Sequence, residues 1–398
     1  MIKYLKIILL LILSIIFFPN KKILIFGDRR GFRFADNSRY LFLLLQKNSE
    51  FRCIWVTKND AILKDLRGNN LECYKVVSFK GFYYSLKAKW HIFNHSSKDT
   101  SENLSLFRNK LNLWHSTPLK KLKKFENNNI IYKYLFKLRN FFIKEYILLG
   151  NNNYSLHLMS QFHPNRYKKI IANLPRNIIL NKDTKKYDYL RSDYEKNVIR
   201  KLDNLNKKII GYFPTFREKS KDMFIDINSN KELLNLNNTL EKNNSIILFK
   251  RHQNSFKEDK STSYDLENEK INSELMELSN FIALEYECDL NSILSKCDVL
   301  ITDYAGVIFD YLFLDKPAIL YCPDLELYKK NPGIALELEK QNFAYLAKDK
   351  FQLYKLLEEY FTDEKKFKQF HELSRKDMLE YMYPNKNFLN EIKQLLNT

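Results

Sequence analysis

The sequence predicts an α/β protein in which two doubly wound, Rossmann-like domains face a common cleft. Short apolar runs alternate with helix-like segments, and this alternation is typical of β-α-β units around a parallel sheet. A polar stretch at residues 181–206 divides the alternation into two halves. The chain has 398 residues, which is enough for about two to three domains with buried cores.

The expected elements follow one another along both halves. In the first half, strands are expected at Ile23–Phe26, Cys53–Thr57, Tyr74–Val77, Trp90–Phe93 and Leu111–Trp114. Helices are expected around Asn37–Lys47 and Ala61–Arg67. In the second half, strands are expected at Lys208–Phe213, Ser245–Lys250, Phe281–Glu285, Val299–Thr302 and Ala318–Tyr321. Such folds bind ligands beyond the carboxyl ends of their strands, so the residues after each strand are the candidates for a site.

The composition excludes several classes of protein and favours an anionic partner. Lys and Arg number 66 against 47 Asp and Glu, a net charge of +19 that suits acidic lipid or a phosphorylated substrate. None of the 8 Gly falls into a Walker or dinucleotide-binding spacing, which argues against a P-loop NTPase and a standard NAD enzyme. The 5 Cys form no CxxC pair, so neither disulfides nor structural zinc are expected. No recognised nucleic-acid-binding module is evident, so nucleic acid is not the expected partner.

The N-terminal run Ile7–Phe18 is almost purely apolar and is flanked by lysines. It is shorter than the about 20 residues of a spanning helix, and no cleavage site separates it from the first strand. We interpret residues 1–20 as a membrane-contacting segment; a buried core helix and a signal anchor are the alternatives. A second stretch, Leu119–Leu149, mixes lysines with aromatic residues at helical spacing, as in an interfacial or an ordinary solvated helix.

A histidine follows the last strand that is expected in the first half. This strand delivers His115 to a turn at Pro118, and an imidazole at a strand exit can take a proton from an attacking hydroxyl. A histidine beside a tryptophan is also often a packed structural residue. Lys120 is either a phosphate contact or a solvated charge.

Polar and cationic residues follow two strands of the second half. Thr215 and Arg217 follow one strand, and Lys250 and His252 stand at the end of the next. Arginine, lysine and hydroxyl groups suit phosphate binding, and an exposed basic loop is the alternative interpretation.

A third strand of this half ends at a tight turn. Asp303 ends the strand, and Tyr304, Ala305 and Gly306 are expected to open the next helix. Backbone N–H groups at such a helix start attract anions. Asp303 can cap the helix, bind a ligand hydroxyl, or do both.

No metal site is expected. His91 and His95 have the spacing of a helical metal pair, but their segment is expected to be a strand, in which these positions lie far apart. No acidic pair is expected to accompany them, and no DxD-like triplet is present. We therefore expect a reaction without a metal or another cofactor.

Four of these segments resemble, in the same order, the motifs of the CDP-glycerol glycerophosphotransferase family of teichoic-acid-type primases and polymerases. The family pattern is similar to WHGTPLK, YxPTxR, a Lys…His-Pro strand exit and SDVLITDYSSVxFDYxxLxKPxxxY. The matching segments here are Trp114–Lys120, Tyr212–Arg217, Lys250–Gln253 and Cys297–Tyr321. Weaker similarities lie at Phe26–Phe42 and Leu174–Asn177.

The resemblance implies a GT-B fold and the transfer of an alditol phosphate from CDP-glycerol, or a related CDP-alditol, with release of CMP. The implied acceptor is a hydroxyl of a membrane-associated, lipid-linked glycan or polyol phosphate in teichoic acid or capsule synthesis. His115 matches the expected general base, and His252 matches a histidine that contacts the donor diphosphate. Thr215, Arg217 and Asp303 match donor-site positions.

The other site residues are assigned around these matches. Lys250 and the turn Tyr304–Gly306 are expected to bind the donor phosphates. Asp36, Asn37 and Lys120 are expected on the acceptor side. Residues 21–195 are expected to form the acceptor-side domain, residues 196–375 the CDP-donor domain, and residues 376–398 a helix that packs back on the first. The expected location is the cytoplasmic face of the cell membrane, on acidic lipid.

The sequence also departs from the family pattern. Ser116 replaces the glycine after the motif histidine, Gln253 replaces a proline, and Ala305 and Gly306 replace a Ser-Ser pair. The donor's alditol, glycerol or a relative such as ribitol, therefore stays open. The alternatives are a GT-B glycosyltransferase that uses a nucleotide sugar, and a non-catalytic membrane protein that binds polyanions.

Overall fold

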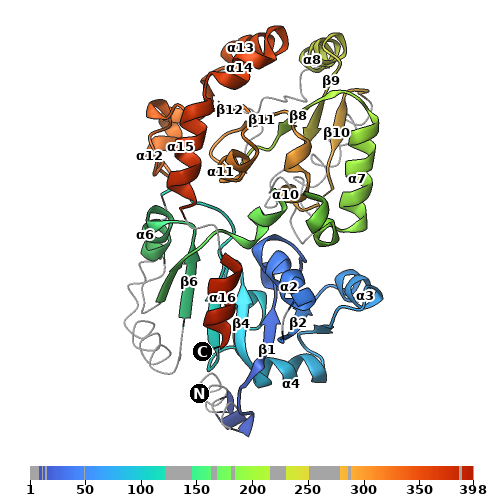
Figure 1. Cartoon of the computed structure of the whole chain (residues 1–398), viewed down its shortest axis with the longest axis vertical. Helices are drawn as coiled ribbons and strands as arrows, with labels where there is room; N and C mark the ends of the chain where they lie inside the picture. The colour runs from blue at the N-terminus through green and yellow to red at the C-terminus, as the bar shows by residue number, and fades with distance from the viewer. Residues whose placement is uncertain are drawn as a thin grey trace. The chain divides into compact units, whose positions relative to one another are not determined.

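The computed structural model describes residues 9–10, 12–13, 16–48, 50–121, 146–162, 168–180, 184–215, 230–250, 278–285, 288–384 and 388–397. The chain forms two compact α/β units, each built on its own parallel sheet (Figure 1). Unit 1 comprises Met1–Thr117, Leu122–Ile178 and Tyr383–Thr398. Unit 2 comprises Pro118–Lys121 and Ile179–Met382.

Unit 1 contains a 7-stranded sheet with the order β3-β2-β1-β4-β5-β6-β7. Its strands are β1 (Asn20–Phe26), β2 (Arg52–Thr57), β3 (Cys73–Lys75), β4 (Ala88–Phe93), β5 (Asn109–Asn112), β6 (Tyr146–Gly150) and β7 (Lys168–Ile171). Its helices are α2 (Asp36–Asn48), α3 (Asp60–Gly68), α4 (Phe79–Lys87), α6 (Asn153–Phe162) and the C-terminal α16 (Phe388–Asn397), with short 3-10 helices η1 (Arg29–Gly31) and η2 (Ser97–Asp99). The continuous apolar run of β1 suits a strand that is paired on both edges and covered on both faces, and Leu24, Ile25 and Phe26 have no exposed surface.

Unit 2 contains a 6-stranded sheet with the order β10-β9-β8-β11-β12-β13. Its strands are β8 (Lys208–Tyr212), β9 (Ser245–Phe249), β10 (Phe281–Ala283), β11 (Val299–Thr302), β12 (Ala318–Tyr321) and β13 (Tyr345–Ala347). Its α-helices are α7 (Asp193–Asn204), α8 (Asn230–Lys242), α10 (Leu290–Ile293), α11 (Val307–Tyr311), α12 (Leu325–Lys330), α13 (Lys350–Thr362), α14 (Glu364–Gln369) and α15 (Glu372–Met382). Its 3-10 helices include η4 (Thr184–Leu190), η7 (Leu294–Lys296), η8 (Leu312–Leu314) and η9 (Leu338–Lys340), and η3 (Pro175–Leu180) runs from unit 1 into unit 2.

The predicted α/β class with two parallel sheets is confirmed, and each expected strand is present. β5 ends at Asn112, before its expected end, because Trp114 has a left-handed backbone (φ 58°) that a strand cannot contain. Strands β6, β7 and β13 were not predicted. β7 and β13 are short and partly exposed, and such runs carry little periodic signal.

The predicted helix over Leu119–Leu149 is wrong at both of its described ends. Lys120 forms an antiparallel bridge with Ile334, and Tyr146–Gly150 is strand β6, paired with β5 and β7. Residues 122–145 lie outside the described residues. The helical spacing of this stretch was overridden at its end by strand pairing in the sheet.

The predicted membrane segment is described only in part. Leu9, Leu10, Ile12, Leu13 and Ile16 are helical. Among the described residues, no helix has the length and apolar character needed to cross a membrane.

His91 is a fully buried side chain of β4. Its Nε2 lies 2.9 Å from the carbonyl oxygen of Ser85, and its Nδ1 lies 3.0 Å from the hydroxyl of Thr100. Burial lowers the pKa of His91 from 6.5 to about 3, and the hydrogen bond to Ser85 opposes this only in part. The folded unit therefore contains a neutral imidazole that resists protonation.

We expect the protein to lose stability as the pH falls below 6.5. The unfolded chain protonates His91 near 6.5 and the folded chain only near 3, so each pH unit between these values costs about 1.4 kcal/mol of unfolding free energy. Urea unfolding at about pH 7.5 and about pH 5, for the native chain and His91→Gln, measures this loss. The variant is expected to lose less stability on acidification; equal losses would contradict the role of His91.

Candidate active site

His115 lies in a constrained turn just beyond β5. Trp114, which precedes it, has a left-handed backbone with φ 58°. A bulky residue adopts this conformation at a cost of about 1–3 kcal/mol, so the surroundings must hold it in place. The Trp114 N–H donates to Asn112 Oδ1 at 2.9 Å, and Asn37 Nδ2 donates to the Trp114 carbonyl at 2.8 Å. Two buried amide side chains therefore fix the turn that presents His115.

Arg176 of η3 connects the same turn to α2. Its guanidinium lies 3.0 Å from Asp36 Oδ1 and also donates to the carbonyl of His115. Its backbone N–H donates to Asn37 Oδ1 at 3.1 Å. Asp36 and Asn37 thus brace the histidine turn, and their predicted contact with the acceptor stays a prediction. Sequence reasoning gave Arg176 no role, although the weak similarity at Leu174–Asn177 pointed to it.

The His115 ring is stacked on two other rings. Its centroid lies 4.9 Å from that of Trp114 and 4.5 Å from that of His95, with angles of 27° and 13° between the planes. His95 Nδ1 lies 3.4 Å from Asp28 Oδ1 and 3.5 Å from Asp99 Oδ2. The prediction that no acidic pair accompanies His95 is therefore wrong, because residues distant in sequence supply the carboxylates. His91, within β4, lies outside this group.

Three predicted donor residues follow adjacent strands of unit 2. Thr215 follows β8, Lys250 follows β9 and Asp303 follows β11, and these strands are neighbours in the order β9-β8-β11. The Thr215 backbone N–H and its hydroxyl each donate to one oxygen of Asp303, both at 2.9 Å. The Lys250 ammonium donates to the carbonyl of Glu285 at 2.6 Å. Arg217 and His252 lie outside the described residues.

Asp303 does not cap the following helix. Helix α11 begins only at Val307, and its N-cap is Gly306, which makes no side-chain capping bond. The expected helix start at Tyr304–Gly306 is therefore a turn before a five-residue helix, and Asp303 is paired with Thr215 instead. Ala305 and Gly306 are partly exposed, so their backbone is the accessible part of this turn.

The Tyr304 side chain is buried in an aromatic stack. Its ring centroid lies 3.6 Å from that of Tyr328, and its hydroxyl donates to Asp324 Oδ1 at 3.0 Å. The Lys120 ammonium lies 5.3 Å from the centre of the Tyr328 ring. Lys120, predicted on the acceptor side, thus belongs to unit 2 and lies beside the stack that supports the turn after Asp303.

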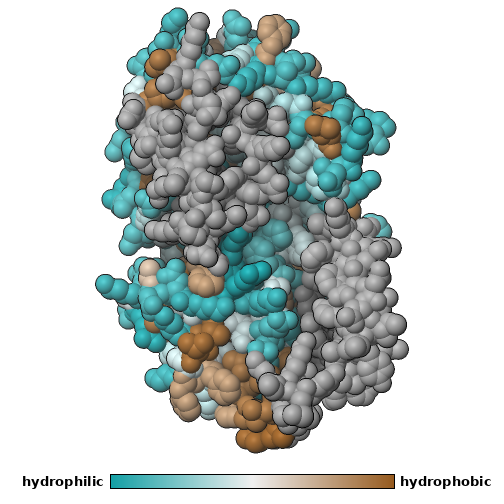
Figure 2. Space-filling view, turned by 180° about the vertical axis from the view of Figure 1, so that it is seen from behind, coloured by the Kyte–Doolittle hydropathy of each residue, from teal (hydrophilic) through white to brown (hydrophobic). Residues whose placement is uncertain are grey.

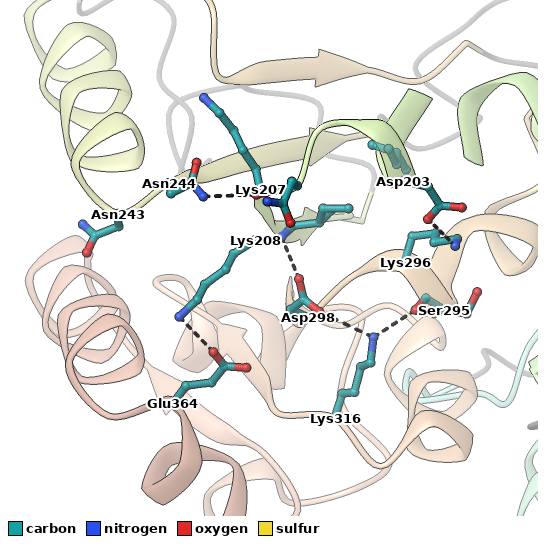
Figure 3. Close-up of a pocket in the computed structure, with 13 residues that line it drawn as sticks. Asp203, Lys207, Lys208, Asn243, Asn244, Ser295, Lys296, Asp298, Lys316 and Glu364 are labelled. Carbon is teal, nitrogen blue, oxygen red and sulfur yellow. Dashed lines mark hydrogen bonds and ion pairs between the residues drawn. The ribbon is translucent and has the colours of Figure 1, made fainter. Parts of the chain in front are cut away.

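A pocket of about 590 Å³ opens at the opposite end of the unit 2 sheet, where strands β8, β9 and β11 begin (Figure 3). Its lysines face acidic partners: Lys208 lies 2.8 Å from Glu364, and Lys296 lies 2.5 Å from Asp203. Lys316 lies 3.7 Å from Asp298 and donates to two backbone carbonyls. Lys207 lies 3.2 Å from Glu241, which does not line the pocket. Each lysine of this pocket therefore has an acidic neighbour, and the pocket contains none of the predicted site residues.

The fold and the sequence both match known proteins. The structure of the wall teichoic acid polymerase TagF has a TM-score of 0.67 and 22% identity, and the match covers 95% of this chain and 88% of that one. A TagF structure obtained with CDPG has a TM-score of 0.70, 22% identity and coverage of 95% and 89%. These similarities show a GT-B-like fold.

Two relatives match most of the chain in sequence. A teichoic acid poly(glycerol phosphate) polymerase of Bacillus spizizenii is 29% identical over 349 residues, which are 81% of this chain and 79% of the relative. A teichoic acid glycerol-phosphate transferase of Staphylococcus aureus is 27% identical over 324 residues, with coverage of 78% and 76%.

The sequence profile of the CDP-Glycerol:Poly(glycerophosphate) glycerophosphotransferase family matches residues 9–386. The chain therefore belongs to this family. It is a transferase of glycerol phosphate from CDP-glycerol, and the nucleotide-sugar alternative is not favoured.

Asp303→Ala is expected to weaken binding of CDP-glycerol about tenfold or more. The change leaves the Thr215 N–H and hydroxyl without their acceptor, at a cost of about 1–3 kcal/mol, and the strand exits of unit 2 lose their fixed geometry. Calorimetric titration with CDP-glycerol measures the affinity. Asp298→Ala is the matched control, because Asp298 stands at the other end of β11 and accepts from the Ile209 N–H at 2.9 Å. Equal losses of affinity in both variants would contradict a donor site at Asp303.

Proposed function

We propose that His115 is the general base of this transferase and that the strand exits of unit 2 bind its CDP-glycerol donor. The observation that carries the proposal is the position of His115, at a strand exit in a turn that buried side chains hold rigid. In unit 2, the paired Thr215 and Asp303 support the donor assignment. The proposed acceptor is a hydroxyl of a lipid-linked glycan or polyol-phosphate chain.

The proposed reaction is a direct displacement at phosphorus. The acceptor oxygen attacks the β-phosphorus of CDP-glycerol and forms the new O–P bond. The bond between this phosphorus and the oxygen that bridges to the α-phosphate breaks, and CMP leaves with the electron pair. His115 takes the proton of the acceptor hydroxyl. Phosphoryl transfer depends mainly on positioning and on neutralising charge, so the proposed reaction needs a base and cationic side chains.

We propose that protein groups alone neutralise the charge of the leaving CMP, without a metal ion or another cofactor. Lys250 lies at the exit of β9, and Arg217 and His252 follow the same strand exits in the sequence. Ala305 and Gly306 add backbone N–H groups at a partly exposed turn. The Ser-Ser pair of the family pattern is absent at these two positions, so the backbone must supply these contacts.

His115→Ala is expected to lower turnover about 10²–10⁴-fold, the usual contribution of a general base, with the affinity for CDP-glycerol retained. Acceptor-dependent release of CMP measures turnover, and the same assay with EDTA tests the proposed metal independence. His157→Ala, at an exposed position of α6, is the matched control and should keep full turnover. His252→Ala and Arg217→Ala are expected to weaken donor binding instead. Full turnover of His115→Ala would refute the base, and loss of native turnover in EDTA would refute metal independence.

We further propose that one end of unit 1 docks on the cytoplasmic face of the membrane. Leu10 is buried against Leu86, Leu104 and Phe107, so the N-terminal residues are attached to this unit. Large apolar side chains remain exposed around them and at the start of α4: Leu9, Ile12, Ile16, Phe18, Val77 and Phe79. Figure 2 shows hydrophobic surface gathered at this end.

Charge and compartment support the same proposal. The exposed Lys21 and Lys22 directly follow the apolar residues, and Lys80 adjoins Phe79. Cations beside apolar side chains suit an anionic membrane surface. The cysteines of the chain are buried free thiols, which fits the reducing cytoplasm.

The double variant Phe18→Ser/Phe79→Ser is expected to bind acidic vesicles about tenfold or more weakly, because two exposed rings no longer insert into the membrane interface. Co-sedimentation with phosphatidylglycerol-containing vesicles measures the affinity. Phe351→Ser is the matched control, since Phe351 in unit 2 is 78% exposed, close to the 76% of Phe18. Docking through unit 1 would be ruled out if the double variant bound as tightly as this control.

A further inference from the structure

His115 shares its strand edge with a second histidine. β4 and β5 are parallel neighbours, so their carboxyl ends bring His95 and His115 together. The two rings are nearly parallel and stacked, with 13° between their planes and 4.5 Å between their centroids. The stack therefore follows from the topology of the sheet and places an imidazole against the face of the proposed base.

His95 is itself held by two buried carboxylates. Asp28 follows β1, the other neighbour of β4, and Asp99 ends η2. Their side chains are 2% and 1% exposed, and they lie 3.4 Å and 3.5 Å from His95 Nδ1. Asp99 also accepts from the backbone N–H groups of Arg30 and His95, at 2.9 Å and 2.8 Å. Carboxylates from two separate segments, the exit of β1 and η2, therefore hold the His95 ring.

The charge of His95 follows from its two acidic neighbours. Burial by itself lowers the pKa of His95, but the nearby carboxylates of Asp28 and Asp99 outweigh it and raise the pKa to about 10. Burial raises the pKa of Asp99, and its pairing with His95 lowers it by more. At neutral pH His95 is thus an imidazolium between two carboxylates, since buried charges require partners.

We propose that His95 is a positioning residue for His115: its ring, fixed by Asp28 and Asp99, sets the plane of the base and keeps it a neutral proton acceptor. The proposal rests on the proposed function of His115. A cation stacked on an imidazole disfavours a second positive charge there. Among the described residues, Arg176 of η3 donates to the His115 carbonyl, and Asp36 of α2 pairs with Arg176. Arg176 and Asp36 form an ion pair with each other, whereas the His95 ring is stacked directly on the His115 ring.

The test compares two substitutions of His95 in the full-length protein. His95→Gln removes the ring and the charge but keeps a side-chain donor for the carboxylates. His95→Arg keeps a planar cation that can stack on the ring and pair with both carboxylates. Acceptor-dependent CMP release gives kcat, the KM for CDP-glycerol and the pH profile, and thermal unfolding verifies that each variant folds.

His95→Gln is expected to lower kcat about tenfold or more near neutral pH, with the KM for CDP-glycerol unchanged. The acid limb of its kcat profile is expected to move to higher pH, because removing a nearby cation makes an imidazole easier to protonate. His95→Arg is expected to keep most of the native kcat and an acid limb close to the native one. A role in folding alone would change stability without moving the acid limb.

Several results would overturn the proposal. One is a His95→Gln protein whose kcat and whose acid limb in the kcat–pH profile are those of the native protein. Another is a loss of kcat in His95→Arg as large as the loss in His95→Gln. A third is turnover that EDTA abolishes and Zn²⁺ or Mn²⁺ restores only when His95 is present, since Asp28, His95 and Asp99 offer ligand atoms within 4.8 Å of one another. Full turnover in His115→Ala would refute the role of His115 as the base. Loss of turnover in His115→Ala together with native turnover in His95→Gln would refute only the positioning role of His95.

Discussion

The left-handed backbone at Trp114 is the constraint on which the candidate active site of unit 1 depends. It ends β5 and turns the chain so that His115 leaves the sheet edge with its ring stacked on other rings. The conformation costs energy, and buried partners from α2 and η3 offset the cost by donating hydrogen bonds to carbonyls of the turn. Because Asn37 bonds both the Trp114 carbonyl and the Arg176 N–H, the turn and its supports form one network.

Parallel sheets explain why the chemistry-bearing residues converge in each unit. In unit 1, Asp28, His95 and His115 follow the adjacent strands β1, β4 and β5. In unit 2, Lys250, Thr215 and Asp303 follow the adjacent strands β9, β8 and β11. The amino ends of the unit 2 strands hold a pocket in which lysines and carboxylates compensate one another. The carboxyl end of this sheet therefore holds the predicted ligand contacts, whereas the amino end holds lysines that are paired with carboxylates.

The sequence could predict what depends on local patterns and could not predict what depends on pairing between distant segments. The strands Val299–Thr302 and Ala318–Tyr321 were predicted at their observed bounds, because continuous apolar runs mark strands of a parallel sheet. The helix predicted over Leu119–Leu149 is absent at both ends of this stretch that the structure describes. Helical spacing in the sequence cannot reveal that the C-terminal end pairs with β5 as strand β6. His115 was identified by its motif, whereas its contacts with Arg176 and His95 join positions far apart in the chain. Such contacts leave no local signal, and only the similarity at Leu174–Asn177 hinted at one of them.

The charges at the described strand exits of unit 1 are largely neutralised locally, and this separates two uses of charge in the molecule. Arg176 pairs with Asp36, and His95 pairs with Asp28 and Asp99. These pairs create fixed geometry and only a weak long-range field. The chain nevertheless has a net charge of +19, so the surplus must come from cations outside these pairs. A surplus of that size acts over about 8 Å at physiological salt, far enough to attract an anionic polymer or an acidic membrane but not to place a single proton. Different residues thus attract anionic partners and fix the geometry of the candidate site. A substitution of a surface cation can weaken the attraction without changing the geometry of the site.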